Sequence, residues 1–206
     1  MELRSSKVRK WVPALVGGSL ALAACFILDR FVAAPVRIST NETAVSQAII
    51  SLGSAQVDFR LRDVDQNNSK DYWAGDIAGL YYYAVEGKPL QMINQAIADA
   101  DASPVRGGGK SPEAFSGYYF LALEPSDEAC PEGMRYRRVK PGKLRDGLGF
   151  AFTAFPASYG ASGQLSFMIT EENMVYAVDN GGAPVLVRPC EKPSPHVHQQ
   201  AFPGNP

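Results

Sequence analysis

Apolar side chains recur at intervals of three and four residues in one segment near the start of the chain. They are Val45, Ala48, Ile49, Leu52, Ala55 and Phe59. This spacing places them on one face of an α-helix, which turns once every 3.6 residues. Ahead of them, Ser39 and Glu42 have the spacing of a capping box, and Pro35 is typical of a break. We therefore predict an amphipathic helix from Ser39 to about Arg62, with one face against a core.

Short apolar and aromatic runs of strand length follow later in the chain. We predict strands at Ser116–Leu123, Leu148–Phe155, Gly163–Ile169 and Met174–Val178. Because only a few residues join the last three, they are expected to form an antiparallel meander rather than a parallel sheet.

The remaining segments are less regular. Tyr72–Val85 is predicted as a strand interrupted by glycines, and Pro89–Asp101 as a second helix with Pro89 at its first position. Glu124–Gly147 is charged and is expected to lie outside the core.

The first thirty residues have the pattern of a membrane anchor. Basic residues precede the uncharged run Trp11–Leu28, which at about 18 residues is long enough to cross a bilayer as a helix. The basic flank should stay in the cytoplasm, so the rest of the chain is expected outside it. Leu22-Ala23-Ala24-Cys25 also fits a lipoprotein cleavage site with Cys25 as the lipidated residue. An uncleaved anchor, a lipoprotein and ordinary cleavage near Ala23 all remain open.

These patterns predict an α+β fold, with an N-terminal membrane helix and an amphipathic helix packed on an antiparallel sheet. The expected divisions are a membrane anchor or lipoprotein signal peptide at 1–30, a stalk at 31–38, an α+β domain at 39–190 and a disordered Pro-rich tail at 191–206.

The composition excludes some partners. The net charge of −1, with mixed signs along the chain, argues against nucleic acid. If Cys25 is lipidated or lies in the membrane, Cys130 and Cys190 remain as a candidate disulfide in an oxidising compartment, the alternative being two unrelated thiols.

One acidic loop is a candidate metal site. Asp63, Asp65, Asn67, Ser69 and Asp71 occupy alternating positions, as oxygen ligands do in a calcium loop. Position 12 of that loop is Ala74, where a bidentate glutamate would be needed, so only weak calcium binding is expected. The alternative is a solvated loop at a helix end.

Signals for catalysis are sparse. The two histidines, His196 and His198, fall in the Pro-rich tail, so no nucleophile–base pair can be assembled on predicted elements and no cofactor is expected. A basic run could contact anionic groups, but nearby acidic residues suggest a solvated loop instead. The run comprises Arg135, Arg137, Arg138, Lys140, Lys143 and Arg145.

The stretch Asn41–Arg60 (NETAVSQAIISLGSAQVDFR) resembles the segment after the membrane anchor in type IV pilins and type II secretion pseudopilins. Further along, Tyr72-Trp73, Gly79-Leu80-Tyr81 and Phe152–Gly160 extend the likeness to an uncharacterised family of bacterial membrane-anchored, pseudopilin-like proteins. The N-terminus departs from prepilins, because it has no Gly-aromatic junction followed by a glutamate. The resemblance therefore implies a pilin-like fold and a location at the membrane more strongly than it implies assembly into a filament.

We accordingly expect a membrane-tethered, extracytoplasmic structural or accessory protein that is not an enzyme. Its expected partners are the membrane and secretion or pilus-like assembly proteins. The alternative is an envelope lipoprotein that acts as a ligand- or calcium-binding module.

Overall fold

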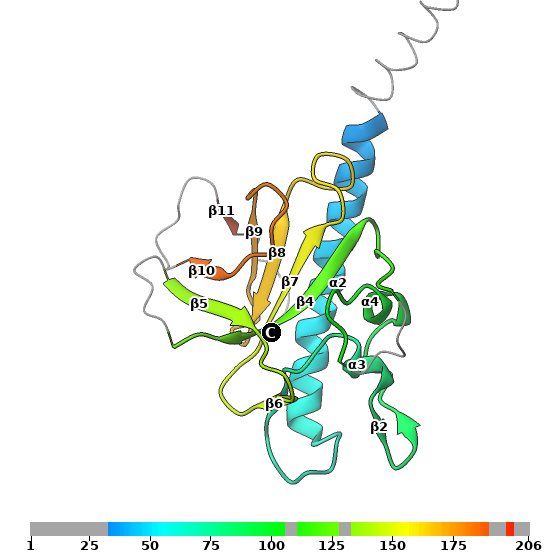
Figure 1. The fold of residues 1–206 in the computed structure, drawn as a ribbon, viewed down its shortest axis with the longest axis vertical. Coiled ribbons are helices and arrows are strands. Elements are labelled where there is room, and N and C mark those ends of the chain that lie inside the picture. Colours follow the sequence, from blue (N-terminus) through cyan, green and yellow to red (C-terminus); the bar gives the residue numbers. More distant parts are fainter. Residues whose placement is uncertain (1–32, 106–110, 128–132, 190–196, 200–206) are drawn as a thin grey trace, which may run out of the picture.

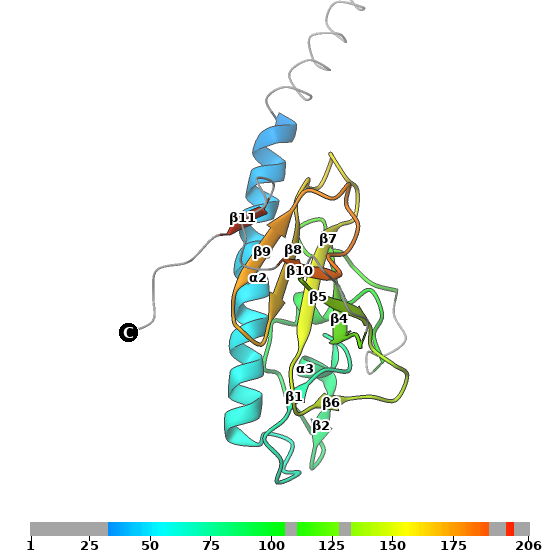
Figure 2. The same ribbon diagram turned by 90° about the vertical axis from the view of Figure 1, so that its left-hand side faces the viewer.

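The computed structural model describes residues 33–105, 111–127, 133–189 and 197–199. Helix α2, Ala34–Arg62, lies along one face of a seven-stranded sheet (Figures 1 and 2). In spatial order the strands are β10 (Val187–Pro189), β5 (Gly133–Arg138), β4 (Tyr118–Pro125), β7 (Ala151–Pro156), β8 (Ser166–Thr170), β9 (Val175–Val178) and β11 (Val197–Gln199). All strand pairs in this sheet are antiparallel, which confirms the α+β class and its antiparallel sheet.

Several predictions concern residues that the structure does not describe. The anchor at 1–30 with Cys25, the cysteines Cys130 and Cys190, and His196 all lie outside the described residues. Within the described ranges, no helix combines the length and apolarity needed to cross a bilayer.

Helix α2 buries the predicted apolar face. Val45, Ile49 and Leu52 have no exposed area, and the helix contacts β1, β7, β8 and β9. Gly53 lets the helix approach the sheet closely, because a Cβ there would lie 2.5 Å from Ile169 Cδ1. The helix–sheet interface is therefore the centre of the core.

The start of this helix differs from the prediction. Helix α2 begins at Ala34 and passes through Ser39 without a break, since Pro35 sits in its first turn, where no backbone N–H donor is needed. Glu42 does not complete a capping box. Its carboxylate accepts backbone N–H groups of Gln164 and Leu165 at 2.8 and 3.0 Å, and so attaches the helix to the loop before β8.

The predicted meander is confirmed, and the sheet is larger than expected. Strands β4, β7, β8 and β9 pair in sequence. The prediction that Glu124–Gly147 lies outside the core is wrong, because β5 pairs with β4 and buries Tyr136. In the predicted tail, β11 pairs with β9 and sets His198 opposite Ala177.

The segment predicted as a strand at Tyr72–Val85 contains only the short strands β1 (Tyr72–Trp73) and β2 (Ala84–Val85), with the helical turn α3 (Gly79–Tyr82) between them. Two buried carboxylates explain the turn. Asp76 accepts the N–H of Gly79, and Asp101 accepts those of Ile77 and Ala78. These bonds satisfy the backbone in a helical conformation.

The helix predicted at Pro89–Asp101 is also shorter. Pro89 belongs to β3 (Lys88–Pro89), which forms a hairpin with β2 around Glu86 and Gly87, both with positive φ. Helix α4 spans only Gln95–Asp99 and starts where the Asn94 side chain accepts the N–H of Ala96.

Candidate functional site

The acidic loop follows α2 directly, and its first carboxylate accepts hydrogen bonds from backbone N–H groups of the loop. Asp63 has a φ of 46°, and its two oxygens accept the N–H groups of Asn67 and Asn68 at 3.0 and 2.9 Å. Ser69 donates its own N–H to the Asn67 side chain at 2.7 Å. These bonds hold the loop in a compact turn at the end of the helix.

The structure brings three of the five predicted ligands together. The Asn67 amide donates to Asp65 and Asp71 at 3.0 and 3.2 Å, and Asp65 forms an ion pair with Arg145. Arg145 lies on β6 (Arg145–Asp146), which pairs with β1. Burial of Asp65 raises its pKa, although Arg145 opposes the shift. One oxygen on each aspartate, Oδ1, is buried without a hydrogen-bond partner.

Three features bear on a metal at this loop. The two unpartnered oxygens leave acceptor capacity for a cation, since hard cations take oxygen ligands. Asp63 is already committed to the backbone, however. No group of three or more His, Cys, Asp or Glu side chains in the described ranges is arranged to hold a metal. The calcium site therefore stays a prediction.

Some residues of the basic run form ion pairs with described carboxylates, and others do not. Arg137 and Lys143 both contact Glu124, at 2.9 and 3.0 Å, and Lys143 also contacts Asp146 at 2.6 Å. Burial alone would raise the pKa of Glu124, but the hydrogen bonds and charges of Lys143 and Arg137 outweigh it, and the pKa lies below its ordinary value. Arg138 and Lys140 form no ion pair among the described residues.

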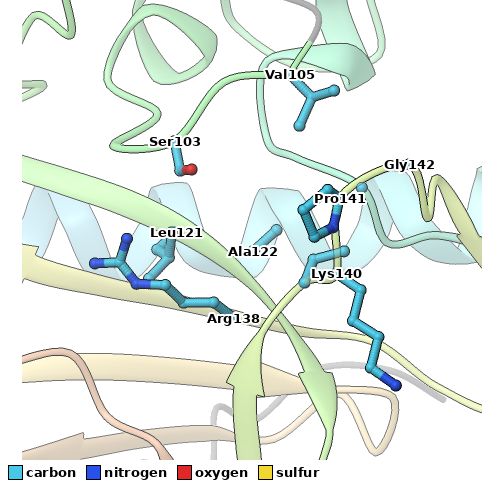
Figure 3. Close-up of a pocket in the computed structure, with 10 residues that line it drawn as sticks. Ser103, Val105, Leu121, Ala122, Arg138, Lys140, Pro141 and Gly142 are labelled. Atoms are coloured by element: carbon cyan, nitrogen blue, oxygen red, sulfur yellow. The ribbon is translucent and has the colours of Figure 1, made fainter.

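The unpaired cations border a cavity of about 240 Å³ (Figure 3). Its lining comes from β4, from the end of β5 and the turn after it, from the loop after α4 and from the segment after β1. The lining residues are Gly75, Ser103, Val105, Leu121, Ala122, Arg138, Val139, Lys140, Pro141 and Gly142. Sequence reasoning missed this site, although Lys140-Pro141-Gly142 is a recognisable turn motif within the basic run.

One wall of the cavity is held by the two buried carboxylates that also form α3. Asp101 accepts the N–H of Ser103 at 2.8 Å, and Asp76 accepts that of Val105 at 2.7 Å. Burial raises the pKa of Asp101 to about 6, while its backbone donors oppose the rise. The loop is therefore fixed by charged acceptors inside the fold rather than by surface contacts.

One protein-family model matches the chain over most of its length. Residues 33–186 match the model described as "Protein of unknown function (DUF2950)". The chain belongs to this DUF2950 family. Searches of curated proteins and of solved structures each found no match.

The DUF2950 match covers α2, the acidic loop and both walls of the cavity. Both candidate sites therefore lie within the domain that the family model describes. Strand β11 lies beyond the matched range.

We predict that Glu124→Gln lowers the free energy of unfolding by about 2 kcal/mol at pH 7, because two cations lose a buried carboxylate. The folded pKa of Glu124 lies below its ordinary value of 4.5, so its contribution is present above that pH and disappears as the pH falls. The difference between wild type and variant should therefore shrink on acidification.

Chemical denaturation at several pH values measures this difference. The control is Glu113→Gln, which removes an exposed carboxylate and should behave as wild type throughout. A Glu124 variant as stable as wild type at neutral pH would contradict the assignment.

Proposed function

We propose that this protein is a membrane-tethered, extracytoplasmic structural or accessory protein of the pseudopilin type, which catalyses no reaction and docks through α2 onto the helix of a neighbouring pilin-like subunit. The tether is supported by the apolar run Trp11–Leu28 and its basic flank. The plan of one long helix on an antiparallel meander supports the likeness to pilins. The outer face of α2 carries the proposal.

That outer face is uncharged along most of its length. Between Ile38 and Asp58, every exposed residue is a serine, a threonine, a glutamine or a valine: Ser39, Thr40, Thr43, Gln47, Ser51, Ser54 and Val57. At its two ends the face carries the exposed apolar residues Val36 and Leu61, with 63% and 68% of their surface exposed, and also charged groups, Arg37 at one end and the Asp58–Arg62 ion pair at the other. A solvated helix face ordinarily carries charged residues, so this composition requires another explanation.

The hydroxyl groups on this face are largely satisfied within the helix. Thr40 and Thr43 donate to carbonyls one turn earlier, each at 2.9 Å, and Ser51 donates to Ala48 O at 2.7 Å. Because these donors already have acceptors, little hydrogen bonding to water is lost when the face is covered. Gln47 is the longest polar side chain of the face, and its neutral amide can donate to and accept from a facing helix. The remaining side chains of this face are small and uncharged.

Small side chains allow the backbones of two helices to approach closely, so this face suits helix–helix packing. Helix α2 lies at one side of the molecule and extends beyond the strands at its N-terminal end (Figure 2). A helix in that position can contact a neighbour without displacing the sheet. We therefore take the partner to be the corresponding helix of another tethered subunit.

We predict that Ser51→Glu prevents this docking, because it places a charge in the middle of a dry interface. Crosslinking in native membranes, followed by affinity recovery, should yield pilin-like subunits with the wild-type protein and little or none with the variant. The fold should be unaffected, since Ser51 is exposed and surface changes usually alter stability by less than about 0.5 kcal/mol.

The matched control is Ser111→Glu, which places the same charge on an exposed segment between α4 and β4. It should retain the crosslinked partners. If Ser51→Glu and wild type recover the same subunits in the same amounts, docking through α2 is refuted.

The alternative is an envelope lipoprotein that binds calcium through the acidic loop. It is favoured by the buried, unpartnered Oδ1 atoms of Asp65 and Asp71. With the Asn67 side chain reoriented, its oxygen could join them, because the same group now bridges both aspartates.

In that alternative, millimolar calcium stabilises the protein by about 1 kcal/mol and raises its melting midpoint by about 3 °C. Asp71→Asn should abolish the shift, and Asp127→Asn, which changes a carboxylate on another loop, should retain it. Thermal unfolding with and without calcium provides the measurement. No shift in wild type, or an equal shift in Asp71→Asn, would eliminate this alternative.

A further inference from the structure

The cavity beside Arg138 exists because two segments cover the same edge of β4 and then diverge. At one end, Phe120 exchanges hydrogen bonds with Ala100 and Ala102, at 2.9 and 2.7 Å. At the other end, β5 pairs with β4 only from Leu123 onward. Leu121 and Ala122 lie between these two contacts and form part of the lining.

Both walls of this opening are rigid. On one side, Lys140 to Lys143 form a turn in which Pro141 precedes Gly142, whose φ is +85°, and Lys143 N donates to Lys140 O at 3.1 Å. On the other side, Ser103 and Val105 are held by the buried carboxylates of Asp101 and Asp76. A site held this way needs little reorganisation to accept a ligand.

The interior of the cavity is largely apolar. Leu121 and Ala122 are buried on opposite faces of β4, Leu121 in the cluster with Tyr136 and Ala122 in the cluster with α2, so the cavity borders the strand edge between them. Val105 and Val139 contribute apolar surface on either side. Arg138 is opposite Leu123 and therefore lies on the same face of the sheet as Leu121, while in Figure 3 Lys140 points away from Ser103 and Val105. Arg138 is therefore the cation placed to contact a ligand, while Lys140 adds positive charge at longer range.

Two of the four cations around the cavity form no ion pair with a described residue. Glu124 and Asp146 are neutralised by Arg137 and Lys143, and the two aspartates behind the loop are enclosed by backbone donors. Arg138 and Lys140 have no acidic partner in the described part of the chain. An apolar cavity bordered by unpaired cations is complementary to an anion with an apolar body.

We propose that this cavity binds a small carboxylate attached to a short, branched apolar chain. The guanidinium of Arg138 pairs with the carboxylate, since its planar fork matches that geometry, and the apolar chain lies against Leu121, on the same face of the sheet, and along the strand edge at Ala122. A volume of about 240 Å³ limits the ligand to a small molecule. This binding is independent of docking through α2, because the two surfaces share no residue.

The probe is 4-methylpentanoate, titrated into the full-length protein while backbone amide shifts are followed by NMR. The expected dissociation constant is on the order of 1 mM for a ligand of this size. The largest shifts should fall on Ser103, Ala122 and Gly142. Arg138→Gln should weaken binding about tenfold or more, because a charge-assisted hydrogen bond is lost.

Three controls separate the contributions to binding. Lys88→Gln removes a charge from the distant β2–β3 hairpin and should leave binding unchanged. The neutral 4-methylpentanamide tests the charge of the ligand, and acetate tests its apolar chain; both should bind at least about tenfold more weakly than the probe. Equal binding of either analogue, equal binding to Arg138→Gln, or shifts located elsewhere would each overturn the proposal.

Discussion

The contact between α2 and the sheet is the constraint on which the other features depend. The apolar residues of the helix lie on one face, and β7, β8 and β9 cover them completely at Val45, Ile49 and Leu52. Full burial of such side chains contributes about 1.5–3 kcal/mol each, so the orientation of the helix is fixed. The opposite face must then point away from the sheet. Thr40, Thr43, Ser51 and Ser54 donate their hydroxyl groups to carbonyls of the helix itself, and this leaves an uncharged surface that a second helix can cover.

Buried carboxylates organise the other half of the molecule. Asp76 and Asp101 each accept hydrogen bonds from backbone N–H groups that lie about 25 residues away in the sequence. Each of these contacts is a charge-assisted hydrogen bond. Glu124 does the same for side-chain cations on β5 and the turn after it. The cavity lies between the segments that these acids hold. Arg138 and Lys140, the two unpaired cations at the cavity, form no ion pair with these buried acids.

Local patterns in the sequence predicted the elements whose stability is local. The 3.6-residue period identified α2, and short apolar runs with close turns identified β7, β8 and β9. The failure at 72–85 has a long-range cause, because Asp101 determines the conformation of residues more than 20 positions earlier. The helix at 89–101 is shorter for a local reason, because Pro89 pairs in the β2–β3 hairpin and α4 starts only after Asn94. The acidic loop was found from its spacing, but its ion pair with Arg145 was not foreseeable. The cavity was not foreseeable either. Arg137 and Arg138 are adjacent in the sequence, and only the face of β5 that each occupies distinguishes the paired arginine from the unpaired one.

The accessibility of α2 in its native setting tests docking through this helix most directly. Ser54→Cys places a thiol on the exposed outer face. The variant is labelled with a maleimide in native membranes and as isolated protein, and the labelled peptide is quantified by mass spectrometry. Ser111→Cys, on the exposed segment between α4 and β4, provides the reference. We predict that position 54 reacts readily in the isolated protein and is protected in membranes, while position 111 reacts in both. Equal labelling of position 54 in the two settings would contradict docking through α2.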